Sequence, residues 1–134
     1  MKKQKIHIQG KDISVTVSKT GDDYISLTDM ARYVHTSEPR AVIQNWLRVK
    51  YTIEFIGNWE ILYNLNFKRL EFEAFKNEAG SNSFFLSPEK WIKTTGAIGI
   101  TTTRGRYGGG TFAHKDIAFE FATWISPEFK LYLI

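Results

Sequence analysis

Residues 98 to 113 read Ile98-Gly99-Ile100-Thr101-Thr102-Thr103-Arg104-Gly105-Arg106-Tyr107-Gly108-Gly109-Gly110-Thr111-Phe112-Ala113. The run up to Thr103 is rich in β-branched residues, which favour strands, and the last three residues resume that pattern. Three successive glycines between the two runs allow positive φ angles and the close approach of another backbone. The stretch therefore predicts a β-hairpin with a tight, glycine-rich tip.

The tip of this hairpin carries groups that suit a polyanionic partner. Guanidinium groups and hydroxyls donate hydrogen bonds to phosphates, and arginines on a narrow hairpin can enter a minor groove. We therefore predict that the tip and its flanks contact nucleic acid through Thr102, Thr103, Arg104, Arg106, Tyr107, Gly108 and Gly109.

Upstream, the sequence predicts two short helices, over residues 27–34 and 39–49. The first has its apolar residues at the i, i+3, i+4, i+7 spacing of one buried face, namely Leu27, Met30, Ala31 and Val34. Ser26 followed three residues later by Asp29 resembles a capping box. Before the second helix a Thr-Ser pair supplies an N-cap hydroxyl, and Pro39 suits the first helical turn. Together these elements form a helix pair with a tight turn.

The second helix of the pair has a polar outer face. Arg40, Gln44 and Arg48 are spaced four residues apart, and Asn45 lies beside them. Side chains of these types reach base edges and phosphates from a helix that lies in a DNA groove. A solvated helix face also has this pattern, and these residues alone do not distinguish the two interpretations. The opposite, apolar face is predicted to consist of Val42, Ile43, Trp46 and Leu47.

The positive charge of the chain is segregated. Lysine and arginine number 18 against 14 acids, which gives a net charge of +4. Residues 30–53 and 90–115 together carry +8, whereas residues 54–89 carry −3 and residues 116–134 carry −2. A domain with one anion-facing side is expected to show this distribution, because one surface would then use both basic stretches.

The rest of the sequence is predicted to form scaffold. Alternation around residues 6–17 indicates a β-hairpin, and Tyr24 with Ile25 a short edge strand. Helices are predicted over residues 54–63, 69–79 and 116–125, from Ser87 onward, and from Ser126 onward, with a brief strand over residues 83–86. The residues predicted to face inward are Phe55, Ile56, Trp59, Leu62, Leu70, Phe72, Phe75, Ile117, Phe121, Trp124 and Ile125.

These elements predict one α+β domain over residues 1–134 with a winged helix-turn-helix-like fold. It comprises an N-terminal β-hairpin, a helix pair, inserted helices and a glycine-rich β-hairpin wing. The C-terminal residues end inside an apolar helical pattern without a cap or polar tail, so we expect the natural protein to continue past Ile134. We expect a further C-terminal domain or a homo-oligomer as additional partners. Truncation at Ile134 would itself expose Tyr132 and Leu133 and create an artificial dimer.

Several segments of the sequence resemble the KilA-N domain of phage, bacterial and large DNA virus proteins. They are Tyr24-Ile25-Ser26-Leu27-Thr28-Asp29-Met30-Ala31, Trp59-Glu60, Leu86-Ser87-Pro88, Trp91-Ile92 and, above all, residues 105–121 from Gly105-Arg106-Tyr107 to Phe119-Glu120-Phe121. The resemblance implies a DNA-binding domain related to the APSES domain of fungal transcription factors. It matches the family's helix pair to residues 27–50 and its wing to residues 98–113.

Other function classes have less support in the sequence. The three histidines form no i, i+4 pair, and HExxH, GxSxG and Walker motifs do not occur, so we predict no catalysis, metal site or cofactor. A nuclease is a less favoured alternative to a non-catalytic DNA-binding domain. His114 is expected to cap a helix or contact the wing, not to act as a catalytic base. A protein-interaction module built on the tryptophans and phenylalanines remains an alternative, although aromatics at helical spacing usually form core.

The composition also indicates where the protein acts. Cysteine is absent, which fits a reducing compartment, and the apolar runs are too short for a signal peptide or a membrane span. We therefore predict a cytoplasmic, phage-related transcription regulator that binds double-stranded DNA. The residues expected to contact bases are Arg40, Gln44 and Asn45. Those expected to contact phosphates are Arg48, Lys50, Lys93 and Lys115, and those expected to anchor the wing on DNA are Arg104, Arg106 and Tyr107.

Overall fold

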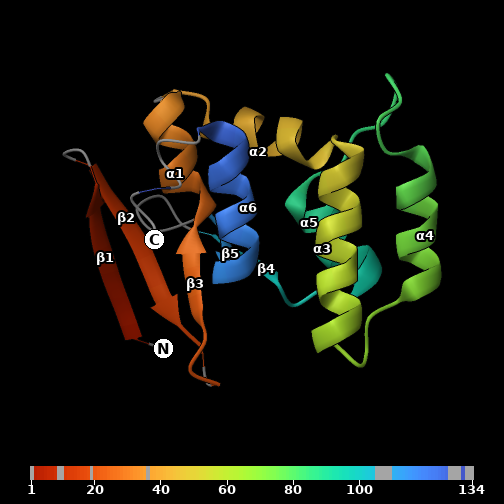
Figure 1. Ribbon diagram of the computed structural model, residues 1–134, viewed down its shortest axis with the longest axis horizontal. Helices are drawn as coiled ribbons and strands as arrows, with labels where there is room; N and C mark the ends of the chain where they lie inside the picture. The colour runs from red at the N-terminus through yellow and green to blue at the C-terminus, as the bar shows by residue number, and fades with distance from the viewer. Residues whose placement is uncertain are drawn as a thin grey trace.

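The computed structural model describes residues 2–8, 11–18, 20–35, 37–104, 110–126 and 131. In that part of the chain, a five-stranded antiparallel sheet and six helices form an α+β fold (Figure 1). The strands are β1 (Lys2–Ile8), β2 (Lys11–Val17), β3 (Asp23–Ser26), β4 (Ile100–Thr103) and β5 (Gly110–His114). The helices are α1 (Leu27–Val34), α2 (Pro39–Leu47), α3 (Lys50–Tyr63), α4 (Arg69–Glu78), α5 (Pro88–Thr95) and α6 (Lys115–Ile125).

The sheet joins the two ends of the chain, in the order β1-β2-β3-β5-β4. The predicted N-terminal hairpin is confirmed, since β1 and β2 pair with Ile6 opposite Ile13. Strand β3 was expected at an edge, and this is wrong. Ile25 pairs with Val15 on one side and with Ala113 on the other, so β3 is central. The backbone of β3 is paired on both sides by β2 and β5, and the local pattern of two residues does not reveal how many strands pair with it.

The helix pair forms as predicted, with differences at its caps. The Ser26 hydroxyl accepts a hydrogen bond from the Asp29 amide at 3.0 Å and caps α1. The Asp29 carboxylate accepts from the Ser14 amide of β2 at 2.8 Å, so it ties α1 to the sheet instead of completing a capping box. The predicted hydroxyl cap of α2 is wrong, because Glu38 is the N-cap residue and makes no side-chain cap bond. Pro39 is the first residue of α2, as expected.

Helices α3, α4 and α5 form the aromatic side of the core. Helix α3 begins at Lys50, four residues before the expected start, and α2 ends two residues earlier than expected. The predicted strand over residues 83–86 is wrong: this described segment has buried Phe84 and Leu86 but no strand beside it to pair with. The ring cluster between these helices consists of Phe67, Phe72, Phe75 and Trp91.

Four residues that were expected to face the core are exposed. Val34 of α1 is 47% exposed, Leu62 74%, Leu70 85% and Trp124 44%, so their inward placement is wrong. Helical spacing gives the width of an apolar stripe but not how much of it another element covers. On α3 the covered face instead includes Glu60, which has no exposed surface at all.

Strands β4 and β5 form a two-stranded ribbon at one edge of the sheet. They pair antiparallel from Ile100 opposite Ala113 to Thr103 opposite Gly110, which confirms the predicted hairpin ladder. The predicted tip, residues 105–109, lies outside the described residues, as does most of the helix expected after Ser126. Helix α6 packs on β3 and β5, and Figure 1 shows it lying over the middle of the sheet. Among the described helices, none is both long and apolar enough to cross a bilayer.

Candidate nucleic-acid interface

An open groove of about 440 Å³ lies between the helix pair and the outer end of the ribbon. We call it the arginine groove. It brings together residues from three helices and two strands that lie far apart in the sequence. Its lining consists of Thr28, Pro39, Arg40, Ile43, Pro88, Glu89, Thr103, Arg104, Gly110 and Thr111.

Three helices begin at the arginine groove. Pro39 and Pro88 are the first residues of α2 and α5, and Thr28 is the second residue of α1. The N-terminus of a helix carries partial positive charge and free amide groups, so it favours anions. The first turn of α2 has no side-chain cap, which leaves its amides available. The three helix starts thus add partial positive charge beside the arginines of the groove.

Both predicted basic stretches contribute an arginine to this groove. Arg40, the second residue of α2, and Arg104, which follows β4, are exposed and line the same hollow. Thr103 lines it beside Arg104, and the predicted Thr102 is half-buried in β4. The structure therefore brings together Arg40, Thr103 and Arg104 from the predicted site.

Close packing holds the ribbon against the helix pair. The Thr28 hydroxyl of α1 accepts a hydrogen bond from the Thr111 amide of β5 at 2.9 Å. A Cβ atom on Gly110 would lie 2.7 Å from that same hydroxyl oxygen, so only glycine fits without a shift. This fixes where Arg104 leaves the ribbon relative to Arg40.

Glu89, the second residue of α5, is a groove residue that the sequence does not predict. Arg40 Nη2 donates to both Glu89 carboxylate oxygens, at 3.2 and 3.3 Å, and among the described lining residues Glu89 is the only acid. The Ser-Pro-Glu start of α5 was recognised as a helix opening, but the stretch around it was assigned to scaffold. No signal along the chain links this residue to Arg40, because 49 positions separate them.

The other predicted contacts lie outside the lining of the groove. Gln44 is half-buried and Asn45 exposed, both on α2. The three lysines that were predicted to contact phosphates are exposed. Lys50 and Lys115 begin α3 and α6, and Lys93 lies on α5. Arg106, Tyr107, Gly108 and Gly109 fall outside the described residues, so their contribution stays a prediction.

Arg48 has a structural role that the sequence does not indicate. It lies just after α2, and its Nη2 donates to the Asn82 carbonyl oxygen at 3.2 Å. Its own carbonyl accepts from the Gly80 amide at 3.1 Å. Its Nε is buried and has no hydrogen-bond partner among the described residues. Arg48 thus braces the turn between α2 and α3 against the loop that follows α4.

At the inner end of the ribbon, a buried carboxylate organises the backbone. We call the segment Ile98–Ile100 together with His114 the ribbon root. Glu60 of α3 accepts from the Ile98 amide at 3.0 Å and from the Gly99 amide at 2.7 Å. Asn64 donates to the same carboxylate at 2.9 Å. Burial raises the pKa of Glu60 above its usual value, and these donated hydrogen bonds offset part of that rise.

Tyr24 supports the ribbon root from β3. Its hydroxyl donates to the Ile98 carbonyl oxygen at 2.9 Å. Burial is the main cause that raises the pKa of Tyr24, and the negative charges of Glu60 and Asp22 add to the effect. The phenol therefore remains a donor at neutral pH.

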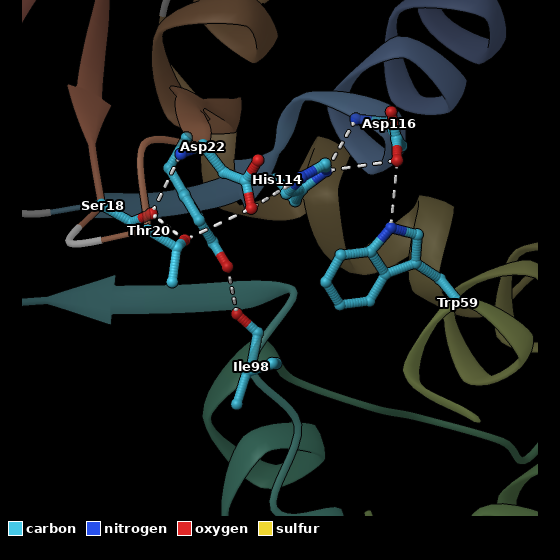
Figure 2. Close-up of polar contacts among 8 residues, drawn as sticks. Ser18, Thr20, Asp22, Trp59, Ile98, His114 and Asp116 are labelled. Atoms are coloured by element: carbon cyan, nitrogen blue, oxygen red, sulfur yellow. Dashed lines mark hydrogen bonds and ion pairs between the residues drawn. The ribbon is translucent and has the colours of Figure 1, made fainter. Parts of the chain in front are cut away.

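His114 ends β5 and caps α6, as the sequence suggested. Its Nδ1 accepts from the Asp116 amide at 3.1 Å, and the ring is 6% exposed. Figure 2 shows the ring between Asp22 and Asp116, with the Trp59 indole directed at Asp116. The Asp22 carboxylate lies 3.7 Å from Nε2. The ring is enclosed, accepts one hydrogen bond at Nδ1, and contacts the rings of Tyr24 and Trp59, so it serves as a structural joint of β3, β5, α3 and α6.

Among the described residues, no three histidine, aspartate or glutamate side chains are placed to hold a metal ion together. The arginine groove contains donors, one acid and hydroxyls, but no histidine or lysine. Such a lining suits binding and recognition of an anion.

The chain is similar in sequence to known proteins. Residues 8–134 match the KilA-N domain. The protein kilA of Escherichia phage P1 is 40% identical over a stretch that covers 34% of this chain and 21% of that protein. The match thus spans about a fifth of the length of the phage protein. No solved structure is significantly similar. The chain belongs to the KilA-N domain family.

Proposed function

We propose that this chain is a non-catalytic domain that binds double-stranded DNA, within a longer phage-related regulator of transcription. The arginine groove and the ribbon beside it form the DNA-facing side. In this proposal the helix pair α1–α2 and the ribbon act as a winged helix-turn-helix. Membership of the KilA-N family supports this function, and so does the charge of the groove.

One observation carries the proposal. Arg40 and Arg104 come from the two basic stretches of the sequence, and they line one groove at which three helices begin. A folded chain has no structural need to bring two exposed arginines and three helix N-termini together, since like charges repel. Glu89 balances one of these positive charges, and a phosphate backbone would supply further negative charge.

The arrangement of the elements suggests how each would contact a duplex. In a helix-turn-helix, the N-terminal residues of the second helix contact base edges in the major groove. Arg40 holds that position on α2, with Gln44 and Asn45 further along. Arg104 and the predicted Arg106 and Tyr107 would follow the backbone or the adjacent minor groove. Lys50, Lys93 and Lys115 are exposed and would add phosphate contacts.

The test is a titration of the protein into a fluorescently labelled random duplex, followed by anisotropy at several salt concentrations. If about five phosphates are neutralised, log affinity should fall against log salt with a slope of about −4 to −5. Arg40→Ala and Arg104→Ala should each weaken binding roughly 5- to 150-fold. Arg69→Ala on α4 removes an exposed arginine outside the groove and is the matched control.

The opposite pattern would defeat the assignment. If both groove variants bind like the unaltered chain while Arg69→Ala weakens binding, the DNA-facing side lies elsewhere. Labelled duplex incubated with Mg²⁺ or Mn²⁺ should remain intact, and cleavage would contradict a non-catalytic role.

A protein-interaction module is the second candidate, because one further surface is apolar. Two hollows of about 180 and 540 Å³ share Tyr51 and Phe55 of α3. Leu62, Tyr63 and Trp124 around them are exposed, which is unusual for side chains of this size. If the protein serves only a protein partner through this surface, a random duplex should fail to bind even at low salt.

A further inference from the structure

The arginine groove contains an acid at the place where the proposed DNA contact begins. Glu89 and Arg40 each occupy the second position of their helices, α5 and α2. The Arg40 side chain is 67% exposed and that of Glu89 48%. The ion pair between them therefore reaches solvent, and a ligand in the groove would meet both groups at once.

Folding does not explain this pair well. Exposed ion pairs contribute between about 0 and 1 kcal/mol to stability. A carboxylate on a phosphate-binding surface also opposes the binding of any DNA by charge repulsion. Glu89 also lies in the first turn of α5, where an acid near the helix N-terminus adds a further ~0.3–1 kcal/mol. On the proposed DNA-facing side it would lower general DNA affinity, which is the expected profile of a group that selects among sequences.

The chemistry of the pair matches one kind of base pair. In the major groove guanine presents two acceptors, O6 and N7, and cytosine presents the N4 amino donor. Arginine donates to the guanine acceptors, and glutamate accepts from the cytosine amino group. A guanidinium beside a carboxylate is thus complementary to guanine beside cytosine.

The geometry leaves both groups able to act. Among the described residues Arg40 has Glu89 as its hydrogen-bond partner, and only its Nη2 is used. Its Nη1 and Nε remain as donors. Two prolines at the first helical positions and the Ser87 cap on the Lys90 amide, at 3.1 Å, fix the start of each helix. Each of the two side chains is therefore held in orientation by the other and by the fixed start of its helix before DNA arrives.

We propose that Arg40 and Glu89 together read a G·C base pair, with Glu89 as a specificity-determining residue that accepts from the cytosine amino group. This inference rests on the proposed DNA-binding function. It goes further by assigning sequence selection to an acid and by naming the base pair that is selected.

The experiment is a binding-site selection from random duplexes, followed by anisotropy titration of the selected duplex and of its single-pair substitutions. The unaltered chain should prefer G·C at one position roughly 5- to 150-fold over the other pairs. Glu89→Ala and Arg40→Ala should each lose that preference at the same position. Glu89→Ala should bind random duplex at least as tightly as the unaltered chain, because repulsion is removed.

Glu71→Ala is the matched control, since it removes an exposed acid from the first turn of another helix, α4. It should leave the preference at every position unchanged. A thermal melt of each variant should show that the fold is intact, because neither acid is buried.

The outcomes separate the two proposals. If the unaltered chain binds and selects a sequence, but Glu89→Ala keeps every preference, then DNA binding stands and this inference is overturned. Tighter binding of Glu89→Ala to all duplexes alike would also overturn it, because Glu89 would then act only by repulsion. If the unaltered chain binds no duplex, both proposals fail.

Discussion

The two ends of the ribbon formed by β4 and β5 are built in opposite ways. At the ribbon root, Glu60 is completely buried and accepts from two backbone amides and from Asn64. At the outer end, Arg104 and Arg40 are exposed, and the pair formed by Arg40 lies at the surface. Polar groups are thus enclosed and satisfied at one end and left to solvent at the other.

This difference distinguishes the buried residues that stabilise the fold from the exposed residues of the candidate binding site. A buried polar group must keep its partners, because an unmade hydrogen bond in the interior is costly. Exposed cations exchange water for phosphate at little cost, so they can bind and release a ligand. Substitutions at the root should therefore act on stability, and substitutions at the outer end on binding.

Glu60→Ala should have the largest effect. It leaves the buried amides of Ile98 and Gly99 without an acceptor, at about 1–3 kcal/mol for each. Urea denaturation followed by tryptophan fluorescence should show the loss in the free energy of unfolding. Glu54→Ala on the same helix is the control and should change stability by less than about 0.5 kcal/mol. Equal losses in the free energy of unfolding for the two variants would contradict a special role of the buried Glu60 carboxylate.

Gly99→Ala should be the next most damaging change. A Cβ atom there would lie 2.6 Å from Ile117 Cδ1, 2.8 Å from Glu60 Oε2 and 2.8 Å from Trp59 Cζ3. Overpacking of this kind costs about 1–3 kcal/mol. Gly110→Ala at the outer end meets mainly the Thr28 side chain, and it should cost less in the same denaturation assay. A larger loss for Gly110→Ala would reverse the comparison.

The pH dependence of stability should also report on the root. Burial raises the pKa of Glu60 above its ordinary value of 4.5, so the folded state holds this proton more tightly than the unfolded state. The contribution of Glu60 is therefore fully present below pH 4.5 and is lost as pH rises through the raised pKa. Denaturation of the unaltered chain and of Glu60→Gln at several pH values tests this. As pH rises, the free energy of unfolding of the unaltered chain should fall relative to that of Glu60→Gln.

The smallest effects on stability should come from the outer end. Arg40→Ala removes an exposed ion pair and Arg104→Ala an exposed side chain, so each should change the free energy of unfolding by less than about 1 kcal/mol. The same two variants are expected to weaken DNA binding. A melting temperature that fell as far for Arg104→Ala as for Gly99→Ala would show that the outer end also supports the fold.

Much of the fold could be predicted because its signals are local. The alternation that leads to the pairing of Ile6 with Ile13, and the spacing of Leu27, Met30 and Ala31, depend only on near neighbours. The central place of β3 and the exposure of Leu62 depend on which distant element covers a face. Periodicity carries no information about that.

The candidate site likewise contains residues that the sequence indicates and residues that only their contacts reveal. The charge pattern drew attention to Arg40 and Arg104, and the structure places both on one groove. Glu89 and Thr28 could not be found in this way, because an acid and a hydroxyl outside the basic stretches gain meaning only from their contacts. Trp59-Glu60 belongs to the family resemblance, but nothing in the sequence indicates that Glu60 holds the backbone just before β4.

The position of β3 also determines when the protein can fold. Tyr24 pairs with His114, so the sheet joins segments from opposite ends of the chain. On the ribosome the N-terminal hairpin can form early, whereas the sheet remains incomplete until β5 has emerged. Long-range pairing of this kind slows folding, because a large loop must close before its contacts form. The nascent chain therefore acquires its arginine groove only after nearly all of the domain has been synthesised.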